Sequence, residues 1–542
     1  MKKYTLGILL LLILGLALFL RVWRLDTIPV AISNDEVVRV YNAYSVWKTG
    51  GYTVDNRFLP LSTSPDGQDL SPVSFYLSAP ISGIFGLNLF TARIGYSLMG
   101  VLSVLGIFLL GSHLFNRKIG LLSAFVLAVS PWHILVSRGA WDAGVAMCWY
   151  IFAVYFFIKY VGTNKIFLAV IFFLLGLYSY HGTVLFFGLM LVVLFWIYRE
   201  KLLKTKTLAI ISVTLLAIGT LPILHALFFG DLSRDSVFFW KSEHTNESAE
   251  KRVLDERALS MGPSFVINAY NNKLTYLTKE VSFNYLQAFS FEHLFIRGDI
   301  NRINGYGNYF WGAMHLIELP FLLIGLYFVA RQKLKVKAVI IAGLLIAPVT
   351  SALILVDRSY LFRSIMMIPF LTIITGAGFY YAFSKLRSYK KAVFLVLVTL
   401  VGIIYMFFIS KHAFTYIYQY GVFGGEHLFK SSRDVAEYVE KNKQFYNEVY
   451  VYTPEYYFLL QYAFFNKIQP DVMQKLWSKP EKWIGNVRFV DWCISPEEFG
   501  NPDEKHGVLY LSPITCTYSF EPLTSINDSE VAIQKIWNIY ER

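Results

Sequence analysis

Charged residues are scarce in this chain. Asp, Glu, Lys and Arg make up 16% of its 542 residues, whereas a soluble protein normally carries about 25%. Hydrophobic residues make up 55% of the sequence, and the mean hydropathy is +0.47. Several uncharged apolar runs come close to the ~20 residues that a helix needs to cross a bilayer. This composition excludes a soluble globular protein and predicts an all-α polytopic membrane protein.

Cysteine is also scarce. The three cysteines are Cys148, Cys493 and Cys516, and they form no CxxC pair that would indicate a zinc site. Cys148 lies in a predicted membrane helix, where a small buried side chain is the simplest interpretation. Cys493 and Cys516 lie in the C-terminal part of the chain, where they can pair if that part faces an oxidising space.

Eleven apolar segments are expected to cross the membrane. The first follows Lys2 and Lys3 and resembles a signal peptide, but no small-x-small cleavage site follows it, so we expect an uncleaved span. The apolar run Val73–Leu89 contains Pro80 and two glycines, which favours a helix at the outer interface. The eleven expected spans are about Tyr4–Leu20, Ala92–Phe115, Ile119–Val136, Ala143–Tyr160, Ile166–Tyr178, Val184–Tyr198, Leu208–Phe229, Tyr309–Ala330, Ala338–Val356, Ser364–Phe383 and Ala392–Ile409.

Basic residues gather in five short loops between these spans, which accounts for a formal net charge of +12 without a nucleic-acid partner. Loops on the other side are longer and carry the acidic residues. Because cytoplasmic loops are enriched in Lys and Arg, this asymmetry places the N-terminus in the cytoplasm and the C-terminal part outside. We expect the plasma membrane of a prokaryote.

The chain divides into two predicted domains. Residues 1–409 form the membrane domain, with extracytoplasmic loops at 21–90 and 230–306. Residues 410–542 form a small extracytoplasmic α/β domain without a glycine-rich phosphate loop. Its expected elements are helices at Arg433–Lys443 and Tyr456–Phe465 and strands at Glu448–Tyr452, Val487–Val490 and Val508–Leu511.

Two adjacent carboxylates, Asp35 and Glu36, follow the first span. One interpretation is structural, because Ser33 precedes an apolar helical pattern and acidic residues favour the first turn of a helix. The other is catalytic, because a carboxylate at the membrane surface can take a proton from an acceptor hydroxyl or amine. A single pair without a companion cluster is a weak signal for a metal, so a divalent metal is not indicated.

Several other ionisable residues lie at the outer ends of the predicted spans. Arg93 suits either headgroup contact or phosphate binding, since a planar guanidinium matches a phosphate. Arg138 and Asp142 suit either a salt bridge at the interface or a functional role. The hairpin tip with Tyr180 and His181 suits a plain polar turn or a ligand site. Two further arginines are unexpected on the outer side and fit an anionic lipid head: Arg358 and Arg363.

Segments of the membrane region resemble one known superfamily in their order and spacing. They are the Asp35-Glu36 pair, FTARIGYSLMGVLSVLGIFLLG with Arg93, LLSAFVLAVSPWHILVSRGAWDA (Leu121–Ala143), GLYSYHG (Gly176–Gly182) and YLFRSIMMIPFLTIITGAG (Tyr360–Gly378). The chain thereby resembles the GT-C glycosyltransferases, specifically protein O-mannosyltransferases and bacterial aminoarabinose transferases. The luminal sugar-binding module of the eukaryotic mannosyltransferases and the WWDYG signature of oligosaccharyltransferases are not found.

The resemblance implies an enzyme that uses a polyprenyl-phosphate sugar and transfers the sugar outside the cytoplasm. Asp35 would activate the acceptor, with Glu36 beside it, and Arg93 would contact the donor phosphate. Arg138, Arg358 and Arg363 would assist with the phosphate, while Asp142, Tyr180 and His181 would line the substrate site. The partners are then the lipid-linked donor, an extracytoplasmic acceptor and the bilayer.

Two other functions remain open from the sequence. A transporter or flippase for lipid-linked glycans would need inverted repeats or charges near the membrane midplane, and neither is recognised. A non-catalytic assembly subunit would use its C-terminal domain to bind a partner.

Overall fold

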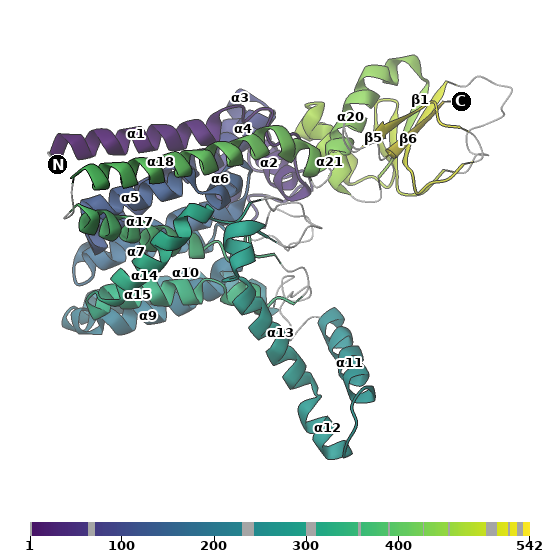
Figure 1. Cartoon of the computed structure of the whole chain (residues 1–542). Helices are drawn as coiled ribbons and strands as arrows, with labels where there is room; N and C mark the ends of the chain where they lie inside the picture. The colour runs from purple at the N-terminus through teal and green to yellow at the C-terminus, as the bar shows by residue number, and fades with distance from the viewer. Residues whose placement is uncertain are drawn as a thin grey trace.

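The computed structural model describes residues 3–62, 71–229, 243–299, 311–355, 359–387, 391–425, 428–453, 456–494, 507–518, 521–527 and 535–541. Long helices run side by side in a bundle, with the N-terminus at one end (Figure 1). The C-terminal domain and the helical projection made by α11, α12 and α13 lie toward the opposite end (Figure 1). The chain is therefore a helix bundle with two appendages, the C-terminal domain and the α11–α13 projection, toward the end opposite the N-terminus.

The bundle is held together by close packing between helices, both consecutive ones and ones further apart in the sequence. Among them, α14 packs on α17, and α4 packs on both α5 and α7. The bundle helices are α1 (Lys3–Val22), α4 (Leu89–Leu114), α5 (Arg117–Val129), α6 (Pro131–Arg138), α7 (Asp142–Tyr160), α8 (Phe167–Leu177), α9 (Val184–Lys204), α10 (Lys206–Phe229), α14 (Leu319–Ala330), α15 (Leu334–Ile346), α16 (Val349–Ala352), α17 (Met367–Leu386) and α18 (Lys391–Phe414).

The expected membrane segments are mostly helical where the structure describes them. Eight helical stretches among the described residues are long and apolar enough to cross a membrane, and a ninth is counted if α5 and α6 form one bent span. The other two expected spans correspond to shorter apolar helices, Asn164–Leu177 and Leu316–Ala330. The all-α polytopic architecture is confirmed, and two of the eleven expected spans are shorter than a full crossing.

Proline residues interrupt two of the helices that the sequence predicts to be continuous. The expected span Ile119–Val136 is split between α5 and α6 by a bend of 60°. Ser130 ends α5 and then caps α6, its hydroxyl accepting a hydrogen bond from the amide of His133, while Pro131 occupies the first helical position. The expected span Ala338–Val356 is similarly interrupted between α15 and α16, just before and at Pro348.

Several helices lie outside the bundle. In the first large loop, α2 (Asn34–Lys48) packs against α3 (Pro72–Phe85), the apolar helix expected at the interface. The second large loop contains α11 (Glu243–Ala258), α12 (Ser264–Tyr270) and α13 (Lys273–Gln287), and α13 and α11 run side by side away from the bundle (Figure 1). Both polar loops are thus ordered by short helices.

The C-terminal domain contains a six-stranded mixed sheet in the order β2-β3-β1-β4-β6-β5. The central strand β1 is parallel to both β3 and β4, and the outer pairs are antiparallel. The expected α/β domain is confirmed. Its elements are α20 (Lys430–Asn442), β1 (Glu448–Tyr452), α21 (Tyr456–Phe465), α22 (Pro470–Trp477), β2 (Lys482–Ile484), β3 (Val487–Val490), β4 (Val508–Pro513), β5 (Thr524–Asn527) and β6 (Lys535–Glu541).

A disulfide joins Cys493, which follows β3, to Cys516, which follows β4. The Cα atoms of the two residues are 5.6 Å apart. Cys148 is buried in α7, as expected. The pairing that the sequence left open is therefore present in the fold.

The C-terminal domain packs directly on α2. One hydrophobic core includes side chains from α2, α4, α20, α21 and the sheet. At its edge, the guanidinium of Arg433 donates to the carbonyl of Val30 at 2.8 Å, and the amide of Gln461 donates to Oδ1 of Asn34 at 3.0 Å. The start of α2 is thus held between the bundle and helices α20 and α21.

Candidate functional site

The acidic pair lies in the first turn of α2, as the capping interpretation predicted. The hydroxyl of Ser33 accepts a hydrogen bond from the amide of Glu36, and Oε2 of Glu36 accepts one from the amide of Ser33. This reciprocal capping box fixes the point where the helix begins. Glu36 is completely buried, whereas Asp35 is exposed. The two neighbouring carboxylates therefore lie in opposite surroundings.

Glu36 forms a buried ion pair with Arg93 of α4. Nε of Arg93 lies 3.1 Å from Oε1 of Glu36, and both side chains are almost fully buried. The Arg93 guanidinium also donates to the carbonyl of Pro29 at 2.8 Å and to the carbonyl of Ala31. Arg93 thus ties both the helix start and the segment before it to the bundle.

The pKa of the Glu36 carboxyl is lowered below its ordinary value of 4.5. Burial alone would raise this pKa, since it penalises the charged form. The charge of Arg93 and hydrogen bonds from Arg93 and from the amides of Ala140 and Ser33 outweigh burial. Glu36 is therefore ionised at neutral pH and is a poor proton acceptor.

A second ion pair joins α2 to the first residue of α7. Nη2 of Arg39 lies 3.2 Å from Oδ2 of Asp142, and the Arg39 guanidinium also donates to the carbonyl of Ala140 at 2.5 Å. The amide of Ala140 in turn donates to Oε1 of Glu36 at 2.7 Å. Asp142 therefore belongs to the same hydrogen-bonded network as the acidic pair, with Arg39 rather than Arg138 as its partner.

The loop before α17 reaches the same network through an aromatic contact. The rings of Trp141 and Phe362 lie 5.0 Å apart, and Trp141 directly precedes Asp142. Arg363 follows Phe362 and is half-buried. The contact brings the Arg363 segment beside the loop that supports Glu36.

Asp299 organises this arginine-bearing loop. Its Oδ2 accepts hydrogen bonds from the amides of Tyr360 and Leu361, at 2.7 and 2.8 Å, and from the hydroxyl of Ser359 at 3.1 Å. Three donors on one oxygen fix the backbone just ahead of Arg363. Asp299 is thus a positioning residue for the loop.

Arg138 is buried within the bundle end rather than presented to a ligand. Its guanidinium donates to the carbonyls of Leu20, Trp23 and Ile28, and its Cζ lies 5.3 Å from the ring centroid of Tyr416. Arg138 therefore holds the end of α1 and the chain that leaves it.

Tyr180 and His181 lie at a hairpin tip, where their rings are 5.6 Å apart. The tip joins the rest of the protein through Ser74, whose hydroxyl donates to the carbonyl of Ser179 at 2.7 Å. The Ser74 carbonyl accepts a hydrogen bond from the hydroxyl of Tyr96 on α4 at 2.8 Å. The tip is therefore connected to α3 and α4.

The network thus brings together Glu36, Arg93 and Asp142, with Arg363 reached through the aromatic contact. Asp35 lies beside it as the sequence neighbour of Glu36. Arg358 lies outside the described residues. Two members, Arg39 and Asp299, were not expected from the sequence. Arg39 follows Glu36 by three residues and therefore shares a face of α2, which is a signal that the sequence contained. The sequence contains no such signal for Asp299, because its partners begin 60 residues further along the chain.

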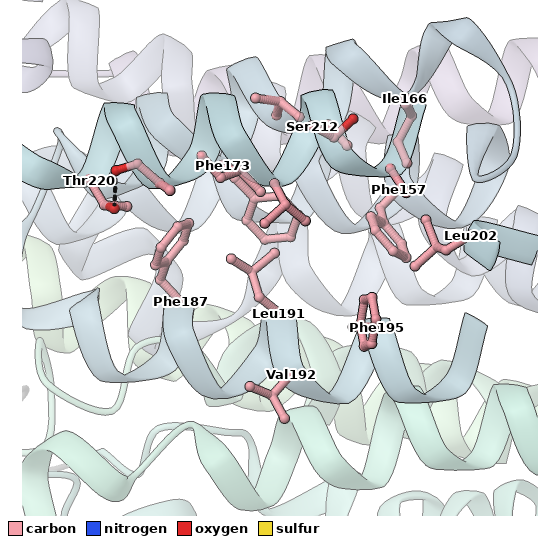
Figure 2. Close-up of a pocket in the computed structure, with 16 residues that line it drawn as sticks. Phe157, Ile166, Phe173, Phe187, Leu191, Val192, Phe195, Leu202, Ser212 and Thr220 are labelled. Atoms are coloured by element: carbon pink, nitrogen blue, oxygen red, sulfur yellow. Dashed lines mark hydrogen bonds between the residues drawn. The ribbon is translucent and has the colours of Figure 1, made fainter. Parts of the chain in front are cut away.

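An apolar pocket of about 450 Å³ lies between α7, α8, α9 and α10 (Figure 2). Phe187 and Leu191 extend from α9 toward Phe173 of α8, and Phe195 extends from α9 toward Phe157 of α7 (Figure 2). No charged residue lines it, and its few polar atoms include the Thr220 hydroxyl, which donates to a carbonyl within its own helix. The pocket is suited to apolar groups and is separate from the charged network.

Within the described part of the chain, no group of three or more His, Cys, Asp and Glu side chains is placed to hold a metal ion.

The fold is similar to that of a solved glycosyltransferase structure named ArnT, in line with the resemblance seen in the sequence. The chain superimposes on ArnT from Cupriavidus metallidurans bound to undecaprenyl phosphate with a TM-score of 0.52 and 11% identity, covering 98% of this chain and 97% of ArnT. The apo form of ArnT aligns with a TM-score of 0.50 over 83% of each chain, also at 11% identity.

A second structural neighbour is the oligosaccharyltransferase AglB from Archaeoglobus fulgidus, in complex with an inhibitory peptide and a dolichol-phosphate. The TM-score is 0.49 and the identity 13%, over 86% of this chain. The present chain spans 64% of the length of AglB.

Residues 69–225 match the model of the dolichyl-phosphate-mannose-protein mannosyltransferase family. No curated protein sequence matches the chain. The matched segment contains Arg93, Arg138, Asp142 and the hairpin tip, and it ends within α10. The resemblance inferred from the sequence is therefore confirmed by a family match in the membrane region and by the fold of the whole chain.

Proposed function

We propose that this protein is a membrane glycosyltransferase that moves a sugar from a polyprenyl-phosphate donor to an extracytoplasmic acceptor. The observation that carries the proposal is the exposed carboxylate of Asp35, next to the buried Glu36–Arg93 pair, on a GT-C fold. The family match in residues 69–225 supports the donor class. The undecaprenyl phosphate in the ArnT structure supports it further.

The proposed reaction is a single displacement that inverts the anomeric carbon. Asp35 takes the proton from an acceptor hydroxyl or amine as that group attacks the anomeric carbon of the donor sugar. A bond forms between the acceptor atom and this carbon, and the bond from the carbon to the phosphate oxygen breaks. The polyprenyl phosphate leaves with the bonding electrons, and nearby arginines stabilise its negative charge.

Asp35 is a better base than Glu36 because their surroundings differ. The oxygens of Glu36 accept hydrogen bonds from Ser33, Arg93 and Ala140, and its pKa is lowered. A buried, fully hydrogen-bonded carboxylate has little capacity to accept a further proton. In the proposed mechanism Glu36 positions the first turn of α2, so that Asp35 faces the substrate.

The arginines take two different roles in this proposal. Arg93 is buried and donates to Glu36 and to two backbone carbonyls, and Arg138 is buried and donates to three backbone carbonyls, so both fix the segment between α1 and α2. Arg363 is half-buried and follows a loop that Asp299 orders, so it is the stronger candidate for the donor phosphate. Arg358, five residues earlier, is proposed to assist it.

The remaining predicted site residues keep supporting roles. Asp142 holds Arg39 and the loop that supports Glu36. Tyr180 and His181 are proposed to face the substrate from the hairpin tip. The basic loops support a cytoplasmic N-terminus, and the disulfide supports an extracytoplasmic C-terminal domain in a prokaryotic plasma membrane.

The proposal is tested by sugar transfer in proteoliposomes. Purified protein is supplied with synthetic polyprenyl-phosphate sugars and a cell-envelope fraction as acceptor, and release of polyprenyl phosphate is measured with transfer of label. Asp35→Asn is expected to lower turnover by about 100- to 10,000-fold, the range for loss of a general base. Asp26→Asn is the matched control, because Asp26 is exposed in the same loop, and it should keep wild-type turnover.

Full turnover in Asp35→Asn would remove Asp35 from the mechanism. Movement of intact lipid-linked sugar between leaflets, without cleavage of its glycosidic bond, would instead identify a flippase.

A further inference from the structure

A second groove lies in the C-terminal domain, far along the chain from the acidic pair. Its volume is about 400 Å³, and it opens where the parallel strands β1 and β3 end. Ligands of open α/β sheets commonly bind at the carboxyl ends of such strands. The groove is lined by Thr453, Tyr456, Trp477, Arg488, Asp491 and Trp492, among others.

Aromatic rings form much of the groove wall. The rings of Tyr456 and Trp477 lie 5.7 Å apart at an interplanar angle of 71°. Trp492 is 45% exposed although it is a large apolar side chain. Cζ of Arg488 lies 5.8 Å from the centroid of the Trp492 ring. The groove therefore offers flat apolar faces next to groups that hydrogen-bond.

The charges that line the groove are balanced. Glu481 pairs with Arg488 at 3.2 Å. Nζ of Lys482 donates to backbone carbonyls, including that of Trp477 at 2.8 Å. Asp491 is exposed and makes no hydrogen bond or ion pair with the residues that the structure describes. Among the residues that the structure describes, two acidic and two basic side chains line the groove, and their balance favours a neutral ligand over an anionic one.

The groove is held in a fixed shape. The disulfide from Cys493 to Cys516 begins immediately after Trp492. The amide of Thr453 donates to the carbonyl of Val490 at 2.5 Å, which joins the ends of β1 and β3. A preformed site loses less conformational freedom when a ligand binds.

We propose that this groove binds a neutral oligosaccharide, and that this oligosaccharide is part of the acceptor. A sugar ring presents an apolar face of C–H groups that packs on an aromatic ring, and its rim of hydroxyls pairs with carboxylate and guanidinium groups. Trp492 and Trp477 provide the aromatic rings of the groove, and Asp491 and Arg488 provide its carboxylate and guanidinium groups. The assignment of the glycan as acceptor rests on the proposed function, whereas the binding itself does not.

The position of the groove connects it to the proposed base. Tyr456, in the first turn of α21, lines the groove, and Gln461 of the same helix hydrogen-bonds Asn34, the neighbour of Asp35. With a rise of 1.5 Å per residue, these two α21 residues are only about 7.5 Å apart along the helix axis. They lie on different sides of α21, so a glycan of several units is needed to pass from the groove toward Asp35.

The test measures glycan binding by the full-length protein in nanodiscs, by saturation-transfer NMR. The neutral probes are maltotriose, mannotriose and chitotriose, and the contrasting probes are trigalacturonic acid and an unglycosylated Ser/Thr-rich peptide. At least one neutral probe should bind. Trp492→Ala should weaken its binding by at least about tenfold and Asp491→Asn by about threefold, in line with lost ring and hydrogen-bond contacts. Trp196→Ala, an exposed tryptophan of α9, is the control and should bind as wild type does.

Three outcomes would overturn the proposal: no neutral probe binds, binding is unaffected by both groove variants, or only the anionic probe or the peptide competes. Asp491→Asn alters an exposed side chain, so it separates lost binding from lost folding. If the Asp35→Asn variant still binds the glycan but no longer transfers sugar, the glycan binding supports the groove and the lost transfer supports the base, each independently of the other. Glycan binding without any transfer by wild type would reject the proposed function and leave the groove intact.

Discussion

Asp35 and Glu36 are neighbours in sequence, but a helix turns successive side chains by about 100°. Glu36 consequently lies against α4 and Asp35 lies at the surface. The buried member holds the start of α2 against α4 through its ion pair with Arg93, and the exposed member is the one proposed to meet the substrate. At the scale of single residues, the site depends on this division between two chemically similar groups.

Replacing Glu36 tests its structural role. Glu36→Gln leaves the Arg93 charge buried without a counter-charge, so we expect the free energy of unfolding to fall by about 3–5 kcal/mol. Thermal unfolding in detergent measures the change. The double variant Glu36→Gln with Arg93→Met removes both charges and should recover part of the loss. Unchanged stability in the single variant would contradict the pairing.

The same pair predicts a dependence of stability on pH. Because the folded-state pKa of Glu36 lies below its ordinary value of 4.5, the unfolded state binds more protons as acid is added. The stabilising contribution is therefore present above pH 4.5 and is lost as the pH falls through the lower, folded-state pKa. Wild type should lose stability in this range more steeply than Glu36→Gln, when unfolding is followed from about pH 6 to about pH 3. Parallel curves would show that Glu36 does not titrate with folding.

Some residue-scale features were predictable and others were not. The Ser33 cap of α2 follows from local pattern, because Ser three residues before Glu is the signature of a capping box. The partner of Glu36 does not, because Arg93 is 57 residues away and only the packing of α4 brings it close. The sequence resemblance therefore implies a phosphate contact for Arg93, whereas in the fold Arg93 binds the carboxylate of Glu36 and two backbone carbonyls.

At the scale of secondary-structure elements, the loop before α17 depends on one side chain from another segment. Asp299→Ala removes the acceptor for the amides of Tyr360 and Leu361. We expect the loop that carries Arg363 to loosen, so the KM for the lipid donor should rise by about tenfold, equivalent to about 1.4 kcal/mol. Steady-state transfer at varied donor concentration measures it.

The control for this variant is Glu292→Ala, which removes a carboxylate of the same segment that pairs with Arg297 at the surface. This control should leave the donor KM unchanged. An equal rise in both variants would indicate a general loss of structure, and no rise in Asp299→Ala would remove the loop from donor binding.

Element positions were the most predictable part of the fold, because long apolar runs must be helical in a membrane. Helix α21 and strands β1 and β3 also matched their expected bounds. The helix breaks at Pro131 and Pro348 were not predicted, because the expected spans follow the apolar runs and the prolines within them were given less weight. Strands β2, β5 and β6 were not expected, since their pairing is set by partners far along the chain.

At the scale of the whole molecule, the disulfide gives a test of orientation. In intact cells, a membrane-impermeant maleimide should label Cys493 and Cys516 only after a mild reducing agent is added. Labelling without reductant, or only after lysis, would contradict an oxidised extracytoplasmic domain. Cys148→Ser is the appropriate background, because it removes the remaining, buried thiol.

Loss of the same disulfide should also weaken the C-terminal domain. The bond joins residues separated by 23 positions, and closing a loop of that size contributes about 3 kcal/mol. Cys493→Ser with Cys516→Ser should therefore unfold at a lower denaturant concentration than wild type, followed by tryptophan fluorescence. An unchanged midpoint would show that the domain does not depend on the bond.

The contacts between α2 and the C-terminal domain also bear on when the protein becomes active during its synthesis. The hydrogen bonds from Arg433 to Val30 and from Gln461 to Asn34 join residues 403 and 427 positions apart. At ~5–20 residues per second, the ribosome makes the second partner roughly 20–85 s after the first. Asp35 is thus made early and the residues that support the start of α2 are made more than 400 positions later, so a chain arrested between them would carry Asp35 without the contacts that hold this helix start.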